Sequence, residues 1–228
     1  QMCIRDREPY LVHLLHHPPC QKVEVRTDLS DVYRTHKPKL PREEAPAYPL
    51  SIIFVARCKS AELLSRMLTE LGVPNVSLHS MLPQSTRLHN LHMFRARRVP
   101  ILISTDVGSR GLDVPDVELV VNWDVPAAWE DYVHRVGRTA RKGRPGWAVS
   151  FVTEHDVDLV QTIEDKIHKT LTEWDMPESQ VLERLSHVSA AKRVASMALH
   201  DEKFGEQRER NKRKAQASQP RSKKHHVQ

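Results

Sequence analysis

Short apolar runs that alternate with amphipathic stretches constrain the fold of this chain more than any other feature of its sequence. Five runs have the apolar and β-branched content of strands, namely 51–55, 76–79, 100–105, 117–123 and 147–153. Helical spacing recurs in six stretches, namely 60–71, 83–95, 129–138, 156–171, 178–185 and one that begins near residue 190. Strands that alternate with helices in this way form a parallel sheet with helices on both faces. The sequence therefore predicts an α/β fold.

The composition divides the chain into three parts. Residues 1–50 combine a short helix at 9–17 with a Pro-rich loop or insertion, and residues 51–188 hold the alternating pattern. Residues 189–228 form a basic tail, predicted to be helical and then disordered, which ends in 28 residues with nine Lys and Arg against four Asp and Glu. The net charge of the whole chain is +6, so the tail holds most of it. Such a tail attracts polyanions without sequence preference.

The segment 104–115 has the composition of a ligand-binding loop. It begins at the carboxyl end of an apolar strand, where parallel α/β sheets bind their ligands. Gly108 and Gly111 would let the backbone approach a ligand closely, and Arg110 and Asp113 flank the second glycine. An ordinary β–α loop with an internal ion pair would have the same residues, so their chemistry alone leaves both interpretations open.

The segment 134–144 concentrates positive charge beside His134. Its cations are Arg135, Arg138, Arg141, Lys142 and Arg144. On a helix, Arg138 and Arg141 would lie on one face, because they are three residues apart. Arginine is suited to bidentate contact with phosphate, so this segment predicts a phosphate-binding surface. A solvated basic helix face is the alternative.

Together the two segments resemble motifs V and VI of the DEAD-box ATP-dependent RNA helicases. Residues 104–113 (STDVGSRGLD) are similar to motif V, A-T-D-V-A-x-R-G-L-D, and residues 134–141 (HRVGRTAR) to motif VI, H-R-x-G-R-x-[GA]-R. Residues 51–55 resemble motif IV, 78–80 stand where the family has an RNA-facing H-G loop, and 84–87 match its Q-x-x-R. These matches follow the family's order and cover roughly residues 50–170. The resemblance is closest to nucleolar members that act in small-subunit ribosome assembly.

The resemblance implies a RecA-like sheet, helicase activity and roles for individual residues. ATP contacts are implied for Gly111 and Asp113 at the ribose, and for Arg138 and Arg141 as arginine fingers at the β- and γ-phosphates. Contacts with the RNA backbone are implied for His79, Ser80, Arg87 and Thr105. Coupling to the other half of a helicase is implied for Arg110, His134 and Arg135. The chain departs from the family at Arg57, near a position that is usually Thr or Asn, and at Ser80, which replaces Gly.

Two motifs of the family are absent from the sequence. The chain has no G-x-x-x-x-G-K-[ST] and no D-E-A-D, both of which belong to the family's first RecA-like domain. The resemblance therefore implies a second RecA-like domain, cut from a longer helicase and inactive alone, with ATP as cofactor and Mg²⁺ held by the missing N-terminal RecA-like domain. Its implied partners are RNA, that first domain and ribosome-assembly adaptor proteins. The implied location is the nucleus or nucleolus, and otherwise the cytoplasm.

Other functional classes fit the sequence less well. No run of about 18 apolar residues exists, so we expect neither a membrane-spanning helix nor a membrane partner. Three scattered cysteines without a C-x-x-C pair favour neither a disulfide framework nor a zinc site, and no metal site is predicted. A stand-alone RNA-binding or scaffolding module without ATPase activity is the main alternative. A DNA-directed helicase of the same superfamily is a lesser one.

Overall fold

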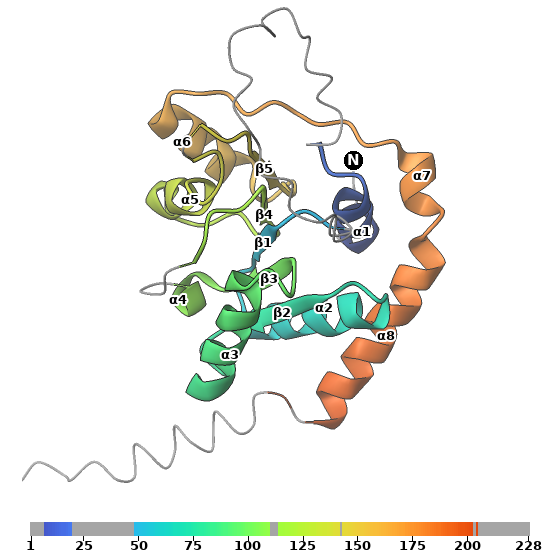
Figure 1. Cartoon of the computed structure of the whole chain (residues 1–228). Helices are drawn as coiled ribbons and strands as arrows, with labels where there is room; N and C mark the ends of the chain where they lie inside the picture. Colours follow the sequence, from blue (N-terminus) through green and yellow to red (C-terminus); the bar gives the residue numbers. More distant parts are fainter. Residues whose placement is uncertain (1–6, 20–47, 110–113, 142, 203, 205–228) are drawn as a thin grey trace, which may run out of the picture.

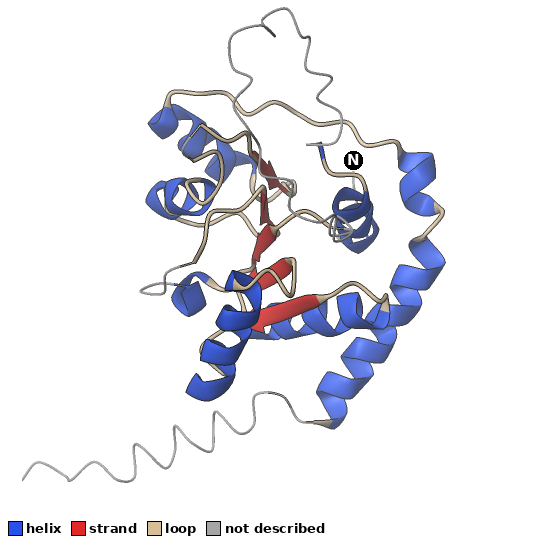
Figure 2. Cartoon of the chain, viewed as in Figure 1, coloured by secondary structure: helices blue, strands red, loops and turns tan. Residues whose placement is uncertain are grey.

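Five parallel strands form one sheet in the computed structural model, which describes residues 7–19, 48–109, 114–141, 143–202 and 204. The strand order is β2-β3-β1-β4-β5. The strands are β1 Ser51–Phe54, β2 Asn75–Leu78, β3 Ile101–Ser104, β4 Leu119–Asn122 and β5 Trp147–Ser150. Figure 2 shows the sheet in red, with helices on both sides of it. The predicted parallel α/β fold is therefore confirmed.

Helices cover both faces of this sheet (Figure 1). On one side lie α1 Arg7–His16, α2 Cys58–Glu70, α7 Glu178–Leu182 and α8 Leu185–Asp201. On the other side lie α3 Gln84–Arg95, α4 Asp106–Ser109, α5 Trp129–Val136 and α6 Val157–Ile167. Among the helices in the described ranges, none combines the length and the hydrophobicity needed to cross a membrane.

The strands supply side chains to two hydrophobic cores. Successive strand residues point to opposite faces of a sheet. Ile53 of β1 therefore packs in the core that includes Met67 of α2 and Ala195 of α8, whereas its neighbour Ile52 packs in the core that includes Phe94 of α3. Burial on both faces explains why these strands are unbroken apolar runs in the sequence.

Helix α8 belongs to the body of the domain. It begins at Leu185, earlier than the predicted start near residue 190, and its residues Ala191, Ala195 and Leu199 are buried. The predicted boundary at residue 188 therefore falls inside a helix that packs on the sheet domain, and we assign this helix to the domain instead of the tail.

Several predicted elements end earlier than the sequence pattern indicated. The predicted helix 156–171 ends at Ile167, because His168 takes a left-handed conformation with φ of 52°. The predicted strand 147–153 ends at Ser150. Residues 20–47 of the predicted Pro-rich segment and 205–228 of the predicted tail lie outside the described residues.

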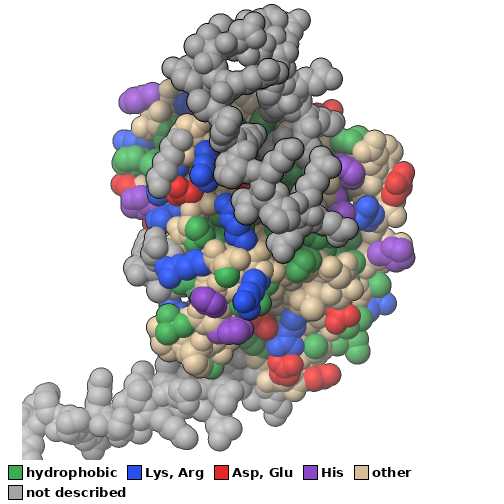
Figure 3. Space-filling view, viewed as in Figure 1, with side chains coloured by type: hydrophobic (Ala, Val, Ile, Leu, Met, Phe, Trp, Pro, Cys, Tyr) green, Lys and Arg blue, Asp and Glu red, His purple; other side chains and the backbone are tan. Residues whose placement is uncertain are grey.

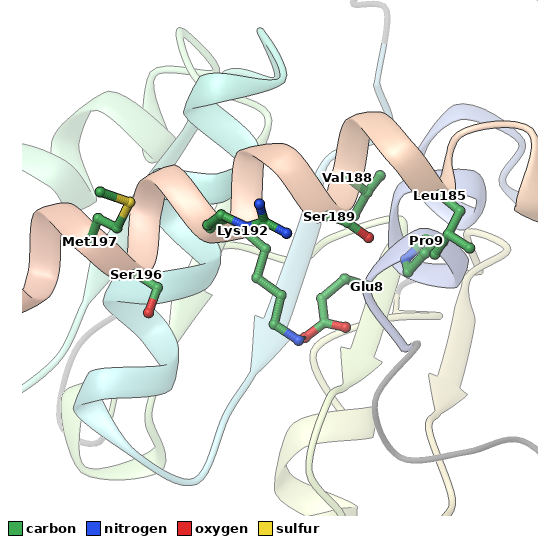
Figure 4. Close-up of a pocket in the computed structure, with 9 residues that line it drawn as sticks. Glu8, Pro9, Leu185, Val188, Ser189, Lys192, Ser196 and Met197 are labelled. Atoms are coloured by element: carbon green, nitrogen blue, oxygen red, sulfur yellow. Dashed lines mark ion pairs between the residues drawn. The ribbon is translucent and has the colours of Figure 1, made fainter.

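A surface pocket of about 340 Å³ lies between α1 and α8. Leu185, Val188 and Met197 of α8 form part of its lining. Across it, Lys192 Nζ pairs with the carboxylate of Glu8 at 2.5 Å, as Figure 4 shows. This ion pair connects α1, which precedes the strands in the sequence, to α8, which follows them.

Candidate functional site

The carboxyl ends of the strands meet at one edge of the sheet, because all five strands are parallel. Phe54 of β1 is in register with Ser104 of β3 on one side and with Asn122 of β4 on the other. Ser104 is in turn in register with Leu78 of β2. Three sequence-predicted site residues directly follow two of these strand ends: His79 and Ser80 follow Leu78, and Thr105 follows Ser104. Ligands of parallel sheets bind at this edge, so the topology gathers those residues where a ligand would bind.

Thr105 closes the turn between β3 and α4. Its N–H donates to the carbonyl oxygen of Leu78 at 3.2 Å, and its hydroxyl oxygen accepts from the N–H of Gly108 at 3.2 Å. Only 5% of Thr105 is exposed. A Cβ on Gly108 would clash with the carbonyl oxygen of Leu78, so this close approach requires glycine. The hydroxyl of Thr105 is therefore engaged inside the turn, and its RNA contact stays a prediction.

Arg87 links α3 to the same turn. Its Nη2 donates to the carbonyl oxygen of Gly108 at 3.2 Å, and its Nη1 donates to Oε1 of Gln84 at 2.9 Å. The Nε atom is buried and has no hydrogen-bond partner among the described residues. The structure thus brings together two residues with predicted RNA contacts, Arg87 and Thr105, around Gly108.

His79 is fully buried at the end of β2. Its Nε2 lies 3.3 Å from Oε2 of Glu62, which also accepts from the hydroxyl of Ser77 at 3.3 Å. The resemblance implied an RNA contact for the loop at His79 and Ser80. The His79 side chain is 0% exposed and does not reach the surface, and an RNA contact of this loop stays a prediction. Ser80, the next residue, is exposed and lies at the surface of the loop.

The carboxyl group of Glu62 is held in its charged form. The hydrogen bond from His79, and then the hydrogen bond and charge of Arg66, keep the pKa of Glu62 below its ordinary value, although burial acts in the opposite direction. Glu62 was not predicted as a site residue. It lies two residues after the predicted helix start, and apart from Arg66 on the same helix its partners, Ser77 and His79, come from β2 and the residue that follows it.

We expect the domain to lose stability as the pH falls below about 4.5, the ordinary pKa of glutamate, in part because Glu62 becomes protonated. Since folding lowers the Glu62 pKa, the unfolded state binds more protons between the unfolded and folded pKa values, and the free energy of unfolding decreases as the pH falls through that window. Glu62→Gln should flatten this part of the profile. Thermal melts of both proteins at acidic pH measure it. Glu70→Gln, at an exposed position on the same helix, is the matched control, and identical profiles for the two variants would contradict the assignment.

Arg135 forms a buried ion pair inside the domain. Its side chain is 3% exposed, and Nε and Nη2 donate to the carboxylate of Asp106 at 2.7 and 2.6 Å. Nη1 donates to Oδ1 of Asn122 at 3.1 Å and to the carbonyl oxygen of Asp124 at 2.7 Å, while the guanidinium lies 5.1 Å from the ring centroid of Phe54. Coupling to another domain, predicted for Arg135, would therefore have to act through these neighbours.

Asp124 joins three parts of this edge. Its Oδ2 accepts from the N–H of Ala56 at 2.7 Å, and its Oδ1 lies 3.7 Å from a guanidinium nitrogen of Arg7. Arg7 also donates to the carbonyl oxygen of Trp123 at 2.8 Å and lies over the Trp123 ring at 4.6 Å. Asp124 was not predicted as a site residue, although an acidic residue directly after a buried strand was a signal that could have found it.

Arg138 and Arg141 follow helix α5 and do not lie on it. The helix ends at Val136, and Thr139, 5% exposed, donates its hydroxyl to the carbonyl oxygen of Val117 at 2.8 Å. The chain therefore leaves the helix to bond with the start of β4. The prediction that the two arginines share one helix face is wrong.

The two arginines are nevertheless accessible, but beside Asp116 and Val117 at the amino end of β4, and not at the carboxyl edge of the sheet. Arg141 is 46% exposed and its Nη1 lies 3.3 Å from Oδ1 of Asp116. Arg138 is half-buried, and its carbonyl oxygen accepts from the N–H of Val117 at 2.9 Å. His134, at the end of α5, is exposed. These groups could contact an anion that approaches from outside the domain.

Other predicted positions cannot be placed in this site. Arg110, Gly111 and Asp113 lie outside the described residues, so the ribose contact and one coupling position stay predictions. Among the residues that the structure describes, no group of three or more His, Cys, Asp or Glu side chains could hold a metal ion.

Basic side chains gather on one face of the molecule. Figure 3 shows Lys, Arg and His side chains along the middle of this face, with fewer acidic side chains among them. A surface of this kind attracts polyanions electrostatically.

A comparison with protein families matches residues 42–143 to the helicase conserved C-terminal domain. ATP-dependent RNA helicase DBP8 of Mycosarcoma maydis is 53% identical over 91% of this chain and 44% of its own length. DBP8 of Saccharomyces cerevisiae is 50% identical over 72% of this chain and 38% of its own length. The chain thus spans less than half the length of these relatives.

Two solved structures have the same architecture. The Escherichia coli DEAD-box protein SrmB, bound to regulator of ribonuclease activity A, is 37% identical, with a TM-score of 0.53 over 56% of this chain and 75% of the SrmB chain. Saccharomyces cerevisiae Dbp5, bound to RNA and ADP BeF3, is 34% identical, with a TM-score of 0.52 over 63% of this chain and 38% of the Dbp5 chain.

Proposed function

The chain belongs to the DEAD-box family and carries its helicase conserved C-terminal domain, and from this premise we propose that the complete protein is an ATP-dependent RNA helicase. In this proposal the chain supplies the second RecA-like domain. ATP and RNA close it against an N-terminal RecA-like domain, the closed form separates a short RNA duplex, and hydrolysis reopens it.

The similarity to an ATP-dependent RNA helicase over 91% of this chain carries the proposal. The arrangement of the site supports the RNA part of it, because the residues with predicted RNA contacts, His79, Ser80, Arg87 and Thr105, lie in or beside the loops at the carboxyl edge of the sheet. Dbp5, a similar protein, has been solved with both RNA and ADP BeF3, which supports the same two ligand classes here.

In the proposed reaction this domain binds and orients the nucleotide. The exposed guanidinium of Arg141 and the half-buried Arg138 fit the phosphates of ATP, since arginine donates in a planar fork that matches phosphate oxygens. Gly111 and Asp113 would hold the ribose. ATP with Mg²⁺, which the N-terminal RecA-like domain would hold, supplies the free energy for opening and closing. The arginines of this chain stabilise the charge that develops in the transition state.

RNA would contact the carboxyl edge of the sheet. Ser80 is exposed at the end of β2, and Arg87 braces the turn that contains Gly108. Both would face the sugar-phosphate backbone, which gives binding without sequence preference. The basic side chains of the face in Figure 3 would add to this attraction.

The proposal extends to the cellular process. We propose that the protein acts in ribosome biogenesis in the nucleolus, together with assembly adaptor proteins. The motif resemblance to nucleolar helicases supports this. Localisation of the tagged complete protein, and rRNA processing after its depletion, are the measurements that test it.

We expect RNA-stimulated ATP hydrolysis by the complete protein and no comparable activity of this chain alone. The chain lacks the phosphate-cradling loop and the D-E-A-D acids, so its arginines have no bound phosphate to act on. Steady-state ATPase assays with saturating RNA measure both. Turnover by the isolated chain on the order of 1 s⁻¹ or more, or a complete protein that does not respond to RNA, would overturn the proposed function.

A further inference from the structure

The buried His79 lies at one end of a chain of polar contacts that reaches the end of α8. Glu62 of α2 accepts from His79 and Ser77 through Oε2, and from Nε of Arg66 through Oε1 at 3.0 Å. The other two guanidinium nitrogens of Arg66 then donate to the carboxylate of Glu202, at 2.8 and 2.5 Å. Glu202 directly follows α8.

A second contact connects the same two places. The ring of Phe204 meets the His79 ring edge-on, with centroids 6.1 Å apart and an interplanar angle of 80°. Phe204 is itself fixed at the end of α8, because its N–H donates to the carbonyl oxygen of Leu199 at 3.1 Å. His79 is thus held by Glu62 through its Nε2 atom and packed against Phe204.

The polar contacts through Glu62 and the ring contact with Phe204 both end at His79, beside a loop for which RNA contact is proposed. His79 directly precedes Ser80, the exposed residue at the start of the loop between β2 and α3. The Nδ1 atom of His79 has no hydrogen-bond partner among the described residues. The orientation of the ring therefore depends on Glu62 and Phe204.

We propose that the end of α8 positions the 79–80 loop for RNA, with Arg66, Glu202 and Phe204 as positioning residues. The inference rests on the proposed RNA helicase function and deepens it. It gives a role in RNA engagement to Glu202 and Phe204, which lie more than 100 positions after the loop in the sequence. None of the three contacts ATP or RNA in this proposal; each acts through His79.

The free energy of unfolding depends little on the ion pair between Arg66 and Glu202. Glu202 is 58% exposed, and exposed ion pairs contribute little to the free energy of unfolding. Helix α8 remains attached to α2 by buried residues such as Ala191 and Ala195. Removing the Glu202 charge should therefore change the loop while it leaves the domain folded, and this separates positioning from a structural role.

The test compares Glu202→Gln with Asp201→Asn in the complete protein. Asp201 is the neighbouring residue, 80% exposed, and its carboxylate lies 3.8 Å from the ring of His200 on its own helix. We expect Glu202→Gln to raise the RNA concentration that gives half-maximal ATPase stimulation by about 3- to 10-fold, and turnover at saturating RNA and the KM for ATP to stay at the wild-type values. Asp201→Asn should match the wild type in every measurement.

Phe204→Leu provides an independent variant for the aromatic route. It should raise the same RNA concentration, and the double variant with Glu202→Gln should raise it further. Melting temperatures identify variants that fail to fold. Folded Glu202→Gln and Phe204→Leu variants that need no more RNA than Asp201→Asn would overturn the inference and leave the proposed function intact.

A direct binding measurement separates the inference from the function that it rests on. Anisotropy of a labelled oligouridine reports RNA affinity of the same variants without ATP turnover. A wild-type protein with no RNA-stimulated turnover would overturn the proposed function, and the inference would then be decided by whether Glu202→Gln binds the oligouridine more weakly than Asp201→Asn does. Equal affinities would overturn it.

Discussion

Replacing Arg138 by alanine in the complete protein is expected to lower RNA-stimulated ATP turnover by roughly 10³- to 10⁵-fold, the range for arginine fingers in phosphoryl transfer. A guanidinium that is already in position stabilises the charge developing on the transferred phosphoryl group without reorganising solvent. Arg141→Ala should have a similar effect, since both arginines lie in the segment that leaves α5. Steady-state ATPase rates at saturating RNA and ATP measure the loss.

Arg144→Ala is the control for both variants. Arg144 is exposed in the same segment, three residues after Arg141. An exposed arginine without a ligand should cost within about 0.5 kcal/mol of stability and little activity. Turnover of Arg138→Ala and Arg144→Ala that is equal and near wild type, at matched melting temperatures, would show that Arg138 is not an arginine finger.

Arg135→Met is expected to destabilise the isolated chain by about 1–3 kcal/mol, because removing a buried donor leaves the hydrogen-bond acceptors around it unsatisfied. Asp106, Asn122 and the carbonyl oxygen of Asp124 would all lose a donor at this position. For a chain of this size the melting temperature should fall by roughly 2–12 °C. Thermal and denaturant unfolding measure the change.

A double-mutant cycle makes the Arg135 prediction specific. Adding Asp106→Asn to Arg135→Met should cost less than the sum of the two single changes, because both changes remove the same ion pair. Arg144→Met, at an exposed position, is the control for loss of a guanidinium. Arg135→Met within about 0.5 kcal/mol of that control would contradict the buried ion pair.

The sheet was predictable because its signal is local and strong. Strands such as Ile101–Ser104 are buried on both faces, so their apolar residues are consecutive and visible in the sequence. Parallel strands place their carboxyl ends together, and this rule alone located the edge with Thr105 and Ser80. The sequence pattern did not predict the order of the strands or their register.

The side-chain partners at the edge were not predictable from spacing. The pattern 134–141 was compatible with a helix through Arg141, but the bond from Thr139 to Val117 ended the helix at Val136, and that bond joins residues far apart in the chain. The burial of His79 has the same origin, because Glu62 and Phe204 come from other elements. Tertiary contacts of this kind override local periodicity.

Helix α8 also determines where this domain can be cut. It spans about 25 Å at 1.5 Å per residue, from the pocket beside α1 to the loop after β2, and it covers α2 along the way. A fragment that stopped at residue 188 would leave that face of α2 exposed to water, and large exposed apolar patches promote self-association. The smallest soluble fragment that keeps the domain intact must therefore include the whole of α8, which ends at Asp201.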